Sequence, residues 1–166
     1  MASKRLALLR HAKSSWSDPQ LEDHDRPLAS RGRRAATRMG VFIQEEGLTP
    51  DLVLCSSATR ARQTLELLEL SSDTEVLIEN ELYGASATAL LARLRRVDDV
   101  TQSVLLIGHN PSIQDAAISL ARSPDAVAHK FPTAALAELL LGNILWRDLR
   151  WGVADLRALT VPSSLS

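Results

Sequence analysis

The chain has 166 residues, of which 45% are hydrophobic and 23% charged, and its formal net charge at pH 7 is −1. A chain of this length can bury a substantial core, so we expect residues 1–166 to form a single globular domain. The small net charge gives no overall attraction to nucleic acid or to an anionic membrane, so an anion site must be local. No apolar run approaches the ~18 residues that a membrane-spanning helix needs.

The cysteine content and the first residues of the chain bear on the compartment in which the protein resides. The single cysteine, Cys55, has no partner for an internal disulfide. The opening MASKRLALLRHA lacks the long apolar core and the cleavage site of a signal peptide. We therefore expect a cytoplasmic protein in a reducing environment, with no membrane partner.

The predicted elements alternate between strand and helix along the chain. In chain order they are a strand at 5–11, a helix at 30–47 with Ser30 as N-cap and Gly47 at its end, a strand at 51–56, a helix at 59–70, a strand at 74–79, a helix at 87–97, a strand at 103–109 and a helix at 111–122. Segments 133–141 and 156–161 are candidates for further strands, although the first fits a helix equally well. This alternation predicts an α/β fold, a three-layer αβα sandwich with a mostly parallel central sheet.

Basic side chains follow three of the predicted strands. Arg10 and His11 end the first strand, Arg60 follows the second in SSATRARQT, and His109 ends the strand at 103–109. Sites in open α/β sheets gather at the carboxyl ends of the strands. We therefore expect these four residues to lie close together, far apart in sequence though they are.

Two arginines and two histidines placed in this way are suited to binding and transferring a phosphoryl group. Two arginines can hold its oxygens with forked, charge-assisted hydrogen bonds. A neutral imidazole can attack phosphorus in line and form a phosphohistidine intermediate, and His11 is best placed for that role. Arg10 and Arg60 would oppose its protonation, while His109 could donate hydrogen bonds to the phosphoryl oxygens.

Four stretches carry a family resemblance: LLRHAKSSW, RPLASRGRRAA, DLVLCSSATRARQT and LLIGHNPSI. Together they resemble the histidine phosphatase superfamily, most closely its short SixA-type phosphohistidine phosphatase branch, over about residues 4–161. The resemblance implies a phosphoglycerate mutase-like fold. It also implies that His11 is the phosphorylated nucleophile, that Arg10 and Arg60 clamp the phosphoryl group, and that His109 completes the pocket.

The same resemblance suggests further substrate-binding residues. Arg26, in DRPL, matches an arginine that short-branch members add to the pocket, and the alternative is a loop arginine paired with Asp23 or Asp25. Ser14 and Ser17 are candidates for hydrogen bonds to phosphate. The chain departs from the family in having alanine where glycine usually follows the Arg-His pair, which requires a turn with negative φ there.

Cleavage of an alkyl phosphate ester gains from a general acid that protonates the departing alkoxide. Ester-cleaving relatives place a glutamate three residues before an aromatic-glycine pair, and in NELYG that position is Asn80. Glu81 lies one position later and is the candidate acid. Without an acid, the N–P bond of phosphohistidine is the better substrate, because imidazole leaves far more readily than an alkoxide.

These features predict a metal-independent phosphatase that uses no cofactor and forms a phosphohistidine intermediate. We expect its substrate to be phosphohistidine on a protein, as in SixA. The alternative is a phosphomonoesterase acting on a small phosphorylated metabolite. A hypothesis of a different class is a non-catalytic phosphate-binding module, which would keep the arginines and relax the nucleophile.

Other classes of protein fit the sequence less well. Cysteine phosphatases need five residues between cysteine and arginine, whereas four separate Cys55 from Arg60, so we expect Cys55 to be a buried strand residue. No P-loop motif is present, and DPQLEDHD is expected to be a solvated acidic loop rather than a metal site. Arg31, Arg34 and Arg38 share a helix face without interleaved aromatics, which argues against nucleic acid and leaves docking of an acidic protein partner open.

Overall fold

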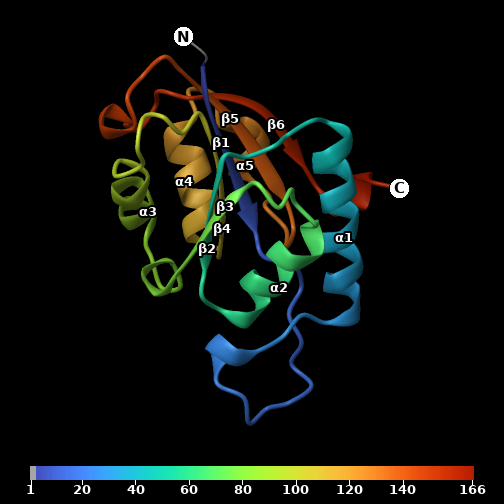
Figure 1. Cartoon of the computed structure of the whole chain (residues 1–166). Helices are drawn as coiled ribbons and strands as arrows, with labels where there is room; N and C mark the ends of the chain where they lie inside the picture. Colours follow the sequence, from blue (N-terminus) through green and yellow to red (C-terminus); the bar gives the residue numbers. More distant parts are fainter. Residues whose placement is uncertain (1–2) are drawn as a thin grey trace.

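The computed structural model describes residues 3–166 and is built around a six-stranded sheet (Figure 1). Its strands are β1 (Lys4–Arg10), β2 (Leu52–Ser56), β3 (Glu75–Glu79), β4 (Ser103–Gly108), β5 (Leu136–Gly142) and β6 (Asp155–Thr160). They lie in the order β3-β2-β4-β1-β5-β6. Strands β1 to β4 pair in parallel, and β5 is antiparallel to both of its neighbours. The predicted mostly parallel sheet is confirmed.

Helices cover both faces of this sheet. They are α1 (Ser30–Glu45), α2 (Thr59–Leu68), α3 (Ala87–Leu94), α4 (Ser112–Leu120) and the short α5 (Asp125–Ala128). Figure 1 shows α1 and α2 on one side of the sheet, with α3 and α4 on the other. The contacts agree, since α1 packs on α2 and α3 packs on α4. The three-layer αβα arrangement predicted from the sequence is therefore correct.

Alternating side chains of the central strands divide the core into two layers. In β4, Val104 and Leu106 belong to the core under α3 and α4, whereas Leu105 and Ile107 belong to the core under α1 and α2. Because successive strand residues point to opposite faces, a strand covered on both sides must be apolar throughout. This explains why the central strands read as uninterrupted apolar runs.

Several boundaries differ from the sequence-based expectation. Ser30 is the first residue of α1 and not its cap, because Ala29 holds the N-cap position without a side-chain hydrogen bond. The helix ends at Glu45, and Gly47 follows with a φ of +65°. The ambiguous segment 133–141 forms β5, in which Leu136, with its side chain among the buried apolar residues, pairs with Leu9 of β1. Sheet pairing across the molecule, which the sequence does not encode locally, decides between helix and strand there.

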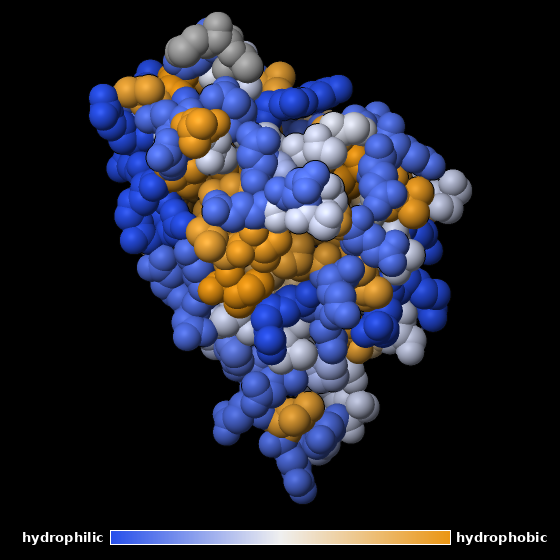
Figure 2. Space-filling model, viewed as in Figure 1, coloured by the Kyte–Doolittle hydropathy of each residue, from blue (hydrophilic) through white to orange (hydrophobic). Residues whose placement is uncertain are grey.

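The β3 edge of the sheet carries an apolar surface. Val76, Leu77 and Ile78 are all exposed, and Figure 2 shows an apolar patch on the face where β3 lies. Glu75 and Glu79 flank these residues, and charges at an edge strand discourage pairing with another sheet. Within residues 3–166, no helix combines the length and the apolar character required to cross a membrane.

The packing of α1 on α2 depends on a close approach at Gly40. A Cβ atom added there would lie 2.6 Å from the carbonyl oxygen of Leu68 and 2.8 Å from its Cα. Because these are backbone atoms, Gly40→Ala should force the helices apart and lower the free energy of unfolding by about 1–3 kcal/mol. Urea denaturation measures the change, with Thr37→Ala on the exposed side of α1 as control. A Gly40→Ala protein as stable as the control would contradict this account of the packing.

Candidate active site

The carboxyl ends of β1, β2 and β4 meet at one edge of the sheet, because β4 lies between the other two. The backbone continues this alignment past the strands, where the His11 amide donates to the Gly108 carbonyl at 3.0 Å. The rings of His11 and His109 come within 5.1 Å between centroids. Residues almost a hundred positions apart thus face each other at the strand ends.

The ring of His11 is fixed in one tautomer by its own loop. Its Nδ1 lies 2.6 Å from the carbonyl oxygen of Ala12, and because a carbonyl only accepts, Nδ1 must carry the proton. In the neutral ring the lone pair then resides on Nε2. The Ala12 amide donates to Oγ1 of Thr64 at 3.0 Å, which anchors this loop to α2. The local geometry therefore presents Nε2 as the nucleophilic atom.

Burial keeps both histidines neutral at physiological pH. The pKa of His11 is lowered to about 3, chiefly by desolvation, which outweighs the opposing hydrogen bond to Ala12. Electrostatic interactions with His109, Arg60 and Arg10 contribute smaller effects that also lower it. Burial likewise lowers the pKa of His109 to about 4, with Arg60 as the next cause. Desolvation disfavours the charged imidazolium, so the lone pair on His11 is available well below neutral pH.

His109 is oriented by the end of β2. Its Nε2 lies 2.8 Å from Oγ of Ser56, and that hydroxyl also accepts from the Ala58 amide at 3.2 Å. The Tyr83 ring packs edge-on against the ring of His109, with centroids 5.6 Å apart. Ser56 thus fixes the orientation of the His109 ring, a role that the sequence analysis did not predict.

Unpartnered polar atoms concentrate at this site. Among residues 3–166, four buried side-chain nitrogens lack a hydrogen-bond partner, and three of them are Nε of Arg10, Nε of Arg60 and Nδ1 of His109. Buried polar groups are normally paired, and groups that are not call for an explanation such as a ligand. Arg10 also donates through Nη1 to the Phe131 carbonyl at 3.0 Å, which fixes its guanidinium beside His11. The arrangement is suited to binding an oxyanion.

Asp23 links Arg26 to Arg60 in this site, and the sequence analysis had considered only its contact with Arg26. The two carboxylate oxygens accept from Arg60 Nη2 at 3.0 Å and from Arg26 Nε and Nη2 at 3.2 and 3.1 Å. Tyr83 donates its hydroxyl to the same carboxylate at 2.5 Å, and this is the first of the causes that hold the pKa of Asp23 well below its usual range. The loop DPQLEDHD is therefore not simply solvated, because Asp23 partly neutralises the basic site.

The residue that follows Asp23 also reaches the site. Nε2 of His24 lies 2.8 Å from Oγ of Ser57, and its ring packs edge-on against Tyr83 at 4.7 Å. Neither His24 nor Tyr83 was among the residues predicted for the site. The only sequence signal for them was their position inside the same segments that carry Arg26 and Glu81.

Arg26 forms an ion pair with Asp23, which is one of the two alternatives considered from the sequence. Besides Asp23, its guanidinium donates through Nη1 to Oγ of Ser14 at 2.7 Å and to the Ser15 carbonyl at 3.2 Å, and it stacks on the Trp16 ring. Most of its N–H groups are therefore engaged within the loop. Arg26 is linked to Arg60 through Asp23, and neither Arg26 nor Ser14 forms a hydrogen bond with His11.

Two predicted residues lie outside this cluster. Ser17 is exposed, and its side chain is paired with the Ser15 hydroxyl at 2.9 Å. The Glu81 carboxylate accepts from Arg96 at 2.7 Å and lies 3.7 Å from Arg93, so it faces α3 and its neighbours. Its contacts are those of a surface ion pair.

Cys55 is a buried residue of β2, as expected. Burial raises the pKa of Cys55 to about 12, and its thiol lies in the core under α1 and α2. Residues 3–166 contain no group of three or more His, Cys, Asp or Glu side chains placed to hold a metal ion.

Comparison with known proteins defines the class of fold and then the family. The SixA protein of Nakamurella multipartitia is 31% identical, with a TM-score of 0.89 over 98% of each chain. SixA of Agrobacterium tumefaciens is 28% identical, with a TM-score of 0.82 over 96% of this chain and 98% of that one. The six-stranded sheet and its helices thus form the phosphoglycerate mutase-like α/β fold.

The sequence comparisons give the same result. The family model of the histidine phosphatase superfamily (branch 1) matches residues 6–87. The uncharacterized protein MT1313 of Mycobacterium tuberculosis is 38% identical over 161 residues, which span 93% of this chain and 99% of the relative. The chain belongs to the histidine phosphatase superfamily, and its structure is of the SixA type.

The buried histidines make stability depend on pH. Unfolded histidine takes up its proton near pH 6.5, whereas His11 and His109 do so near 3 and 4 in the fold, so the unfolded state binds more protons between these values. Stability should therefore fall as the pH is lowered from about 6.5 towards 4. In His11→Asn, which keeps a donor to Ala12, urea denaturation at pH 7, 6, 5 and 4 should show a shallower loss. The exposed His129→Asn is the control, and equal slopes for the two variants would contradict burial as the cause.

Asp23 should compete with an anion for Arg60. Asp23→Asn removes the charge while keeping an oxygen acceptor, so the affinity for inorganic phosphate should rise severalfold in titration calorimetry at pH 7. Asp25→Asn, an exposed neighbour that does not contact Arg60, is the control. Weaker phosphate binding by Asp23→Asn would show that this carboxylate supports the anion site rather than competing at it.

Proposed function

We propose that this member of the histidine phosphatase superfamily removes the phosphoryl group from phosphohistidine on a protein, through a phosphohistidine intermediate on His11. The observation that carries the proposal is the neutral, buried His11 ring, whose Nδ1 proton is held by Ala12 and whose Nε2 is left with its lone pair. A nucleophile fixed in this way needs no general base.

In the first step, the Nε2 lone pair of His11 attacks phosphorus. The new bond between Nε2 and phosphorus forms as the bond between phosphorus and the substrate nitrogen breaks, and that nitrogen keeps the electron pair. Arg10 and Arg60 balance the charge on the phosphoryl oxygens, and His109 lies beside them. This chemistry draws its positive charge from arginine, so we propose that it needs neither a metal ion nor a cofactor.

In the second step, water attacks the phosphorylated His11. The bond between phosphorus and Nε2 breaks, phosphate leaves with the protons of the water, and the neutral ring returns. Splitting the transfer in this way replaces one difficult step with two easier ones.

The carboxylates around the site favour an N–P substrate over an ester. Asp23 is held ionised by Tyr83 and Arg60, and Glu81 is paired with Arg96. Neither is prepared to protonate a departing alkoxide. Phosphohistidine needs no such acid, because the imidazole leaves as a neutral ring when its other nitrogen carries a proton. The names of the SixA relatives agree with this choice of substrate.

A substrate panel tests the proposal. The purified protein is given a histidine-phosphorylated protein, free phosphohistidine and small phosphate esters, each with excess chelator. We expect kcat/KM on the two phosphohistidine substrates to exceed that on the esters by about 100-fold or more, since an alkoxide lacks its acid. His11→Ala should abolish turnover, and Arg60→Ala should reduce it by about 10²-fold or more.

Each outcome of the panel has a distinct meaning. Turnover by His11→Ala would contradict the assignment of His11 as nucleophile. Loss of activity with chelator would contradict the metal-independent mechanism. Preference for an ester would favour a phosphomonoesterase. Phosphate binding without any turnover would favour a non-catalytic module. Cys55→Ser serves as the control and should retain full activity, because its buried thiol takes no part.

A further inference from the structure

A basic groove lies beside the strand-end site, on the side of α1. It is open to solvent. Its basic residues come from the loop after β1, from α1 and from the segment before β5, and they are Lys13, Arg31, Arg38 and Lys130. No acidic residue lines it. For a chain with a net charge of −1, this is a marked local excess of positive charge.

The cations of this groove have no ionic partners within the protein. Among residues 3–166, none of the four forms a salt bridge within 4.0 Å. Nε of Arg38 is the fourth of the buried nitrogens without a hydrogen-bond partner. The surrounding sequence gives no compensation, because residues 26–44 contain five arginines and neither Asp nor Glu. The positive charge is therefore available to an external anion.

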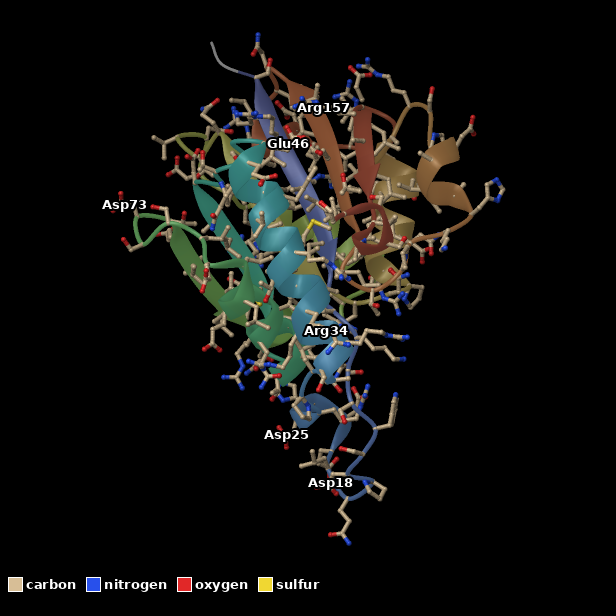
Figure 3. The ribbon with its side chains drawn as sticks, turned by 90° about the vertical axis from the view of Figure 1, so that its right-hand side faces the viewer. Asp18, Asp25, Arg34, Glu46, Asp73 and Arg157 are labelled. Carbon is tan, nitrogen blue, oxygen red and sulfur yellow. The ribbon has the colours of Figure 1, made fainter. Side chains whose placement is uncertain are left out.

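The charge pattern of α1 is unfavourable for the isolated protein. Its first turn contains no acidic residue, and Arg31, Arg33 and Arg34 lie at the end where the helix dipole is positive. In Figure 3, Arg34 lies at the end of α1 that is nearer the loop carrying Asp25, and Glu46 marks the opposite end. An anionic partner bound at this end would relieve the repulsion.

The groove is connected to the loop that carries His11. Lys13 is two residues after His11, and Lys130 precedes Phe131, whose carbonyl accepts from Arg10. The Ala134 amide, close to Lys130 along the chain, donates to the carbonyls of Arg10 and His11 at 3.0 and 3.1 Å. A macromolecule that places a phosphoryl group at His11 would therefore have its neighbouring surface over this groove.

We propose that the groove docks an acidic helical face of the phosphorylated protein substrate. This inference rests on the proposed function and specifies the chemistry of the substrate around its phosphohistidine. Arg31 and Arg38 are seven residues apart, about 10 Å along the helix axis. Carboxylates at positions i, i+4 and i+7 of a partner helix span a similar length and would face the row of cations. No aromatic side chain lines the groove to stack on bases, which favours protein over nucleic acid.

A pair of synthetic helical peptides tests the docking surface. One carries glutamates at i, i+4 and i+7 beside a histidine, and the other carries glutamines at the same positions. Fluorescence anisotropy with the unphosphorylated, labelled peptides reports binding without any turnover. The wild-type protein should bind the glutamate peptide about tenfold more tightly at 20 mM salt, and this preference should disappear at 300 mM salt.

Charge reversal locates the surface. Arg31→Glu/Lys130→Glu changes two exposed cations of the groove and should abolish the preference for glutamate. Arg147→Glu/Arg150→Glu changes two exposed cations after β5, beyond the strand end that pairs with Lys4, and should keep it. Equal binding of the two peptides by the wild type, or a preference that survives in Arg31→Glu/Lys130→Glu, would overturn the proposal. Tighter binding of a 20-base-pair DNA duplex than of the glutamate peptide would overturn it in favour of nucleic acid.

A kinetic comparison separates this inference from the proposed function. On free phosphohistidine, Arg31→Glu/Lys130→Glu should retain kcat/KM within about twofold, because this substrate does not reach the groove. On the phosphorylated glutamate peptide, the same variant should lose about tenfold in kcat/KM, through KM. If the wild type hydrolysed neither substrate, the proposed function would fail, and the anisotropy result would still decide whether the groove binds acidic helices. An equal loss on both substrates would overturn docking as the role of these cations.

Discussion

Parallel pairing of β1 and β2 on either side of β4 is the constraint on which the candidate site depends. It brings three strand ends to one edge of the sheet, so that His11, Arg60 and His109 meet although they are distant in sequence. Two apolar layers hold this pairing, one on each face of the central strands. The core therefore holds the strand ends together, whereas Asp23 and Arg26 lie in a loop between β1 and α1.

At the end of β1, Arg10 must stay charged while the neighbouring His11 must stay neutral. The guanidinium of Arg10 remains charged although burial lowers its pKa, because the ordinary pKa of arginine is far above neutral. Burial next to these charges holds His11 neutral. Asp23 then limits the positive charge that Arg60 adds. A phosphoryl group brings the negative charge that the cluster lacks, and it can reach a nucleophile that needs no activation.

The arrangement of strands and helices was well predicted from the sequence, because periodicity and apolar runs directly reflect burial. The alternation around the central strands was sufficient to predict the sheet, its two covered faces and the convergence of strand ends. It was not sufficient for segment 133–141, where pairing of β5 with β1 decides the outcome.

The loop residues could not be predicted in the same way. The link from Asp23 to Arg60 joins positions 37 residues apart through a loop without periodicity, so no local pattern encodes it. Arg26 was left between two alternatives for the same reason, and the structure shows the pair with Asp23. Glu81 was chosen by its distance from an aromatic-glycine pair, whereas its side chain pairs with Arg96, just after α3, and lies near Arg93 of α3.

The most direct test of the account is to trap the covalent intermediate and locate its phosphorus. The protein is mixed with excess free phosphohistidine, quenched in alkali within milliseconds, and analysed by mass spectrometry of its peptides and by ³¹P NMR. The account predicts an acid-labile, alkali-stable phosphoryl group on Nε2 of His11, and none in His11→Asn. A phosphoryl group on another residue, or on Nδ1 of His11, would contradict the tautomer and the mechanism that follow from the Ala12 hydrogen bond.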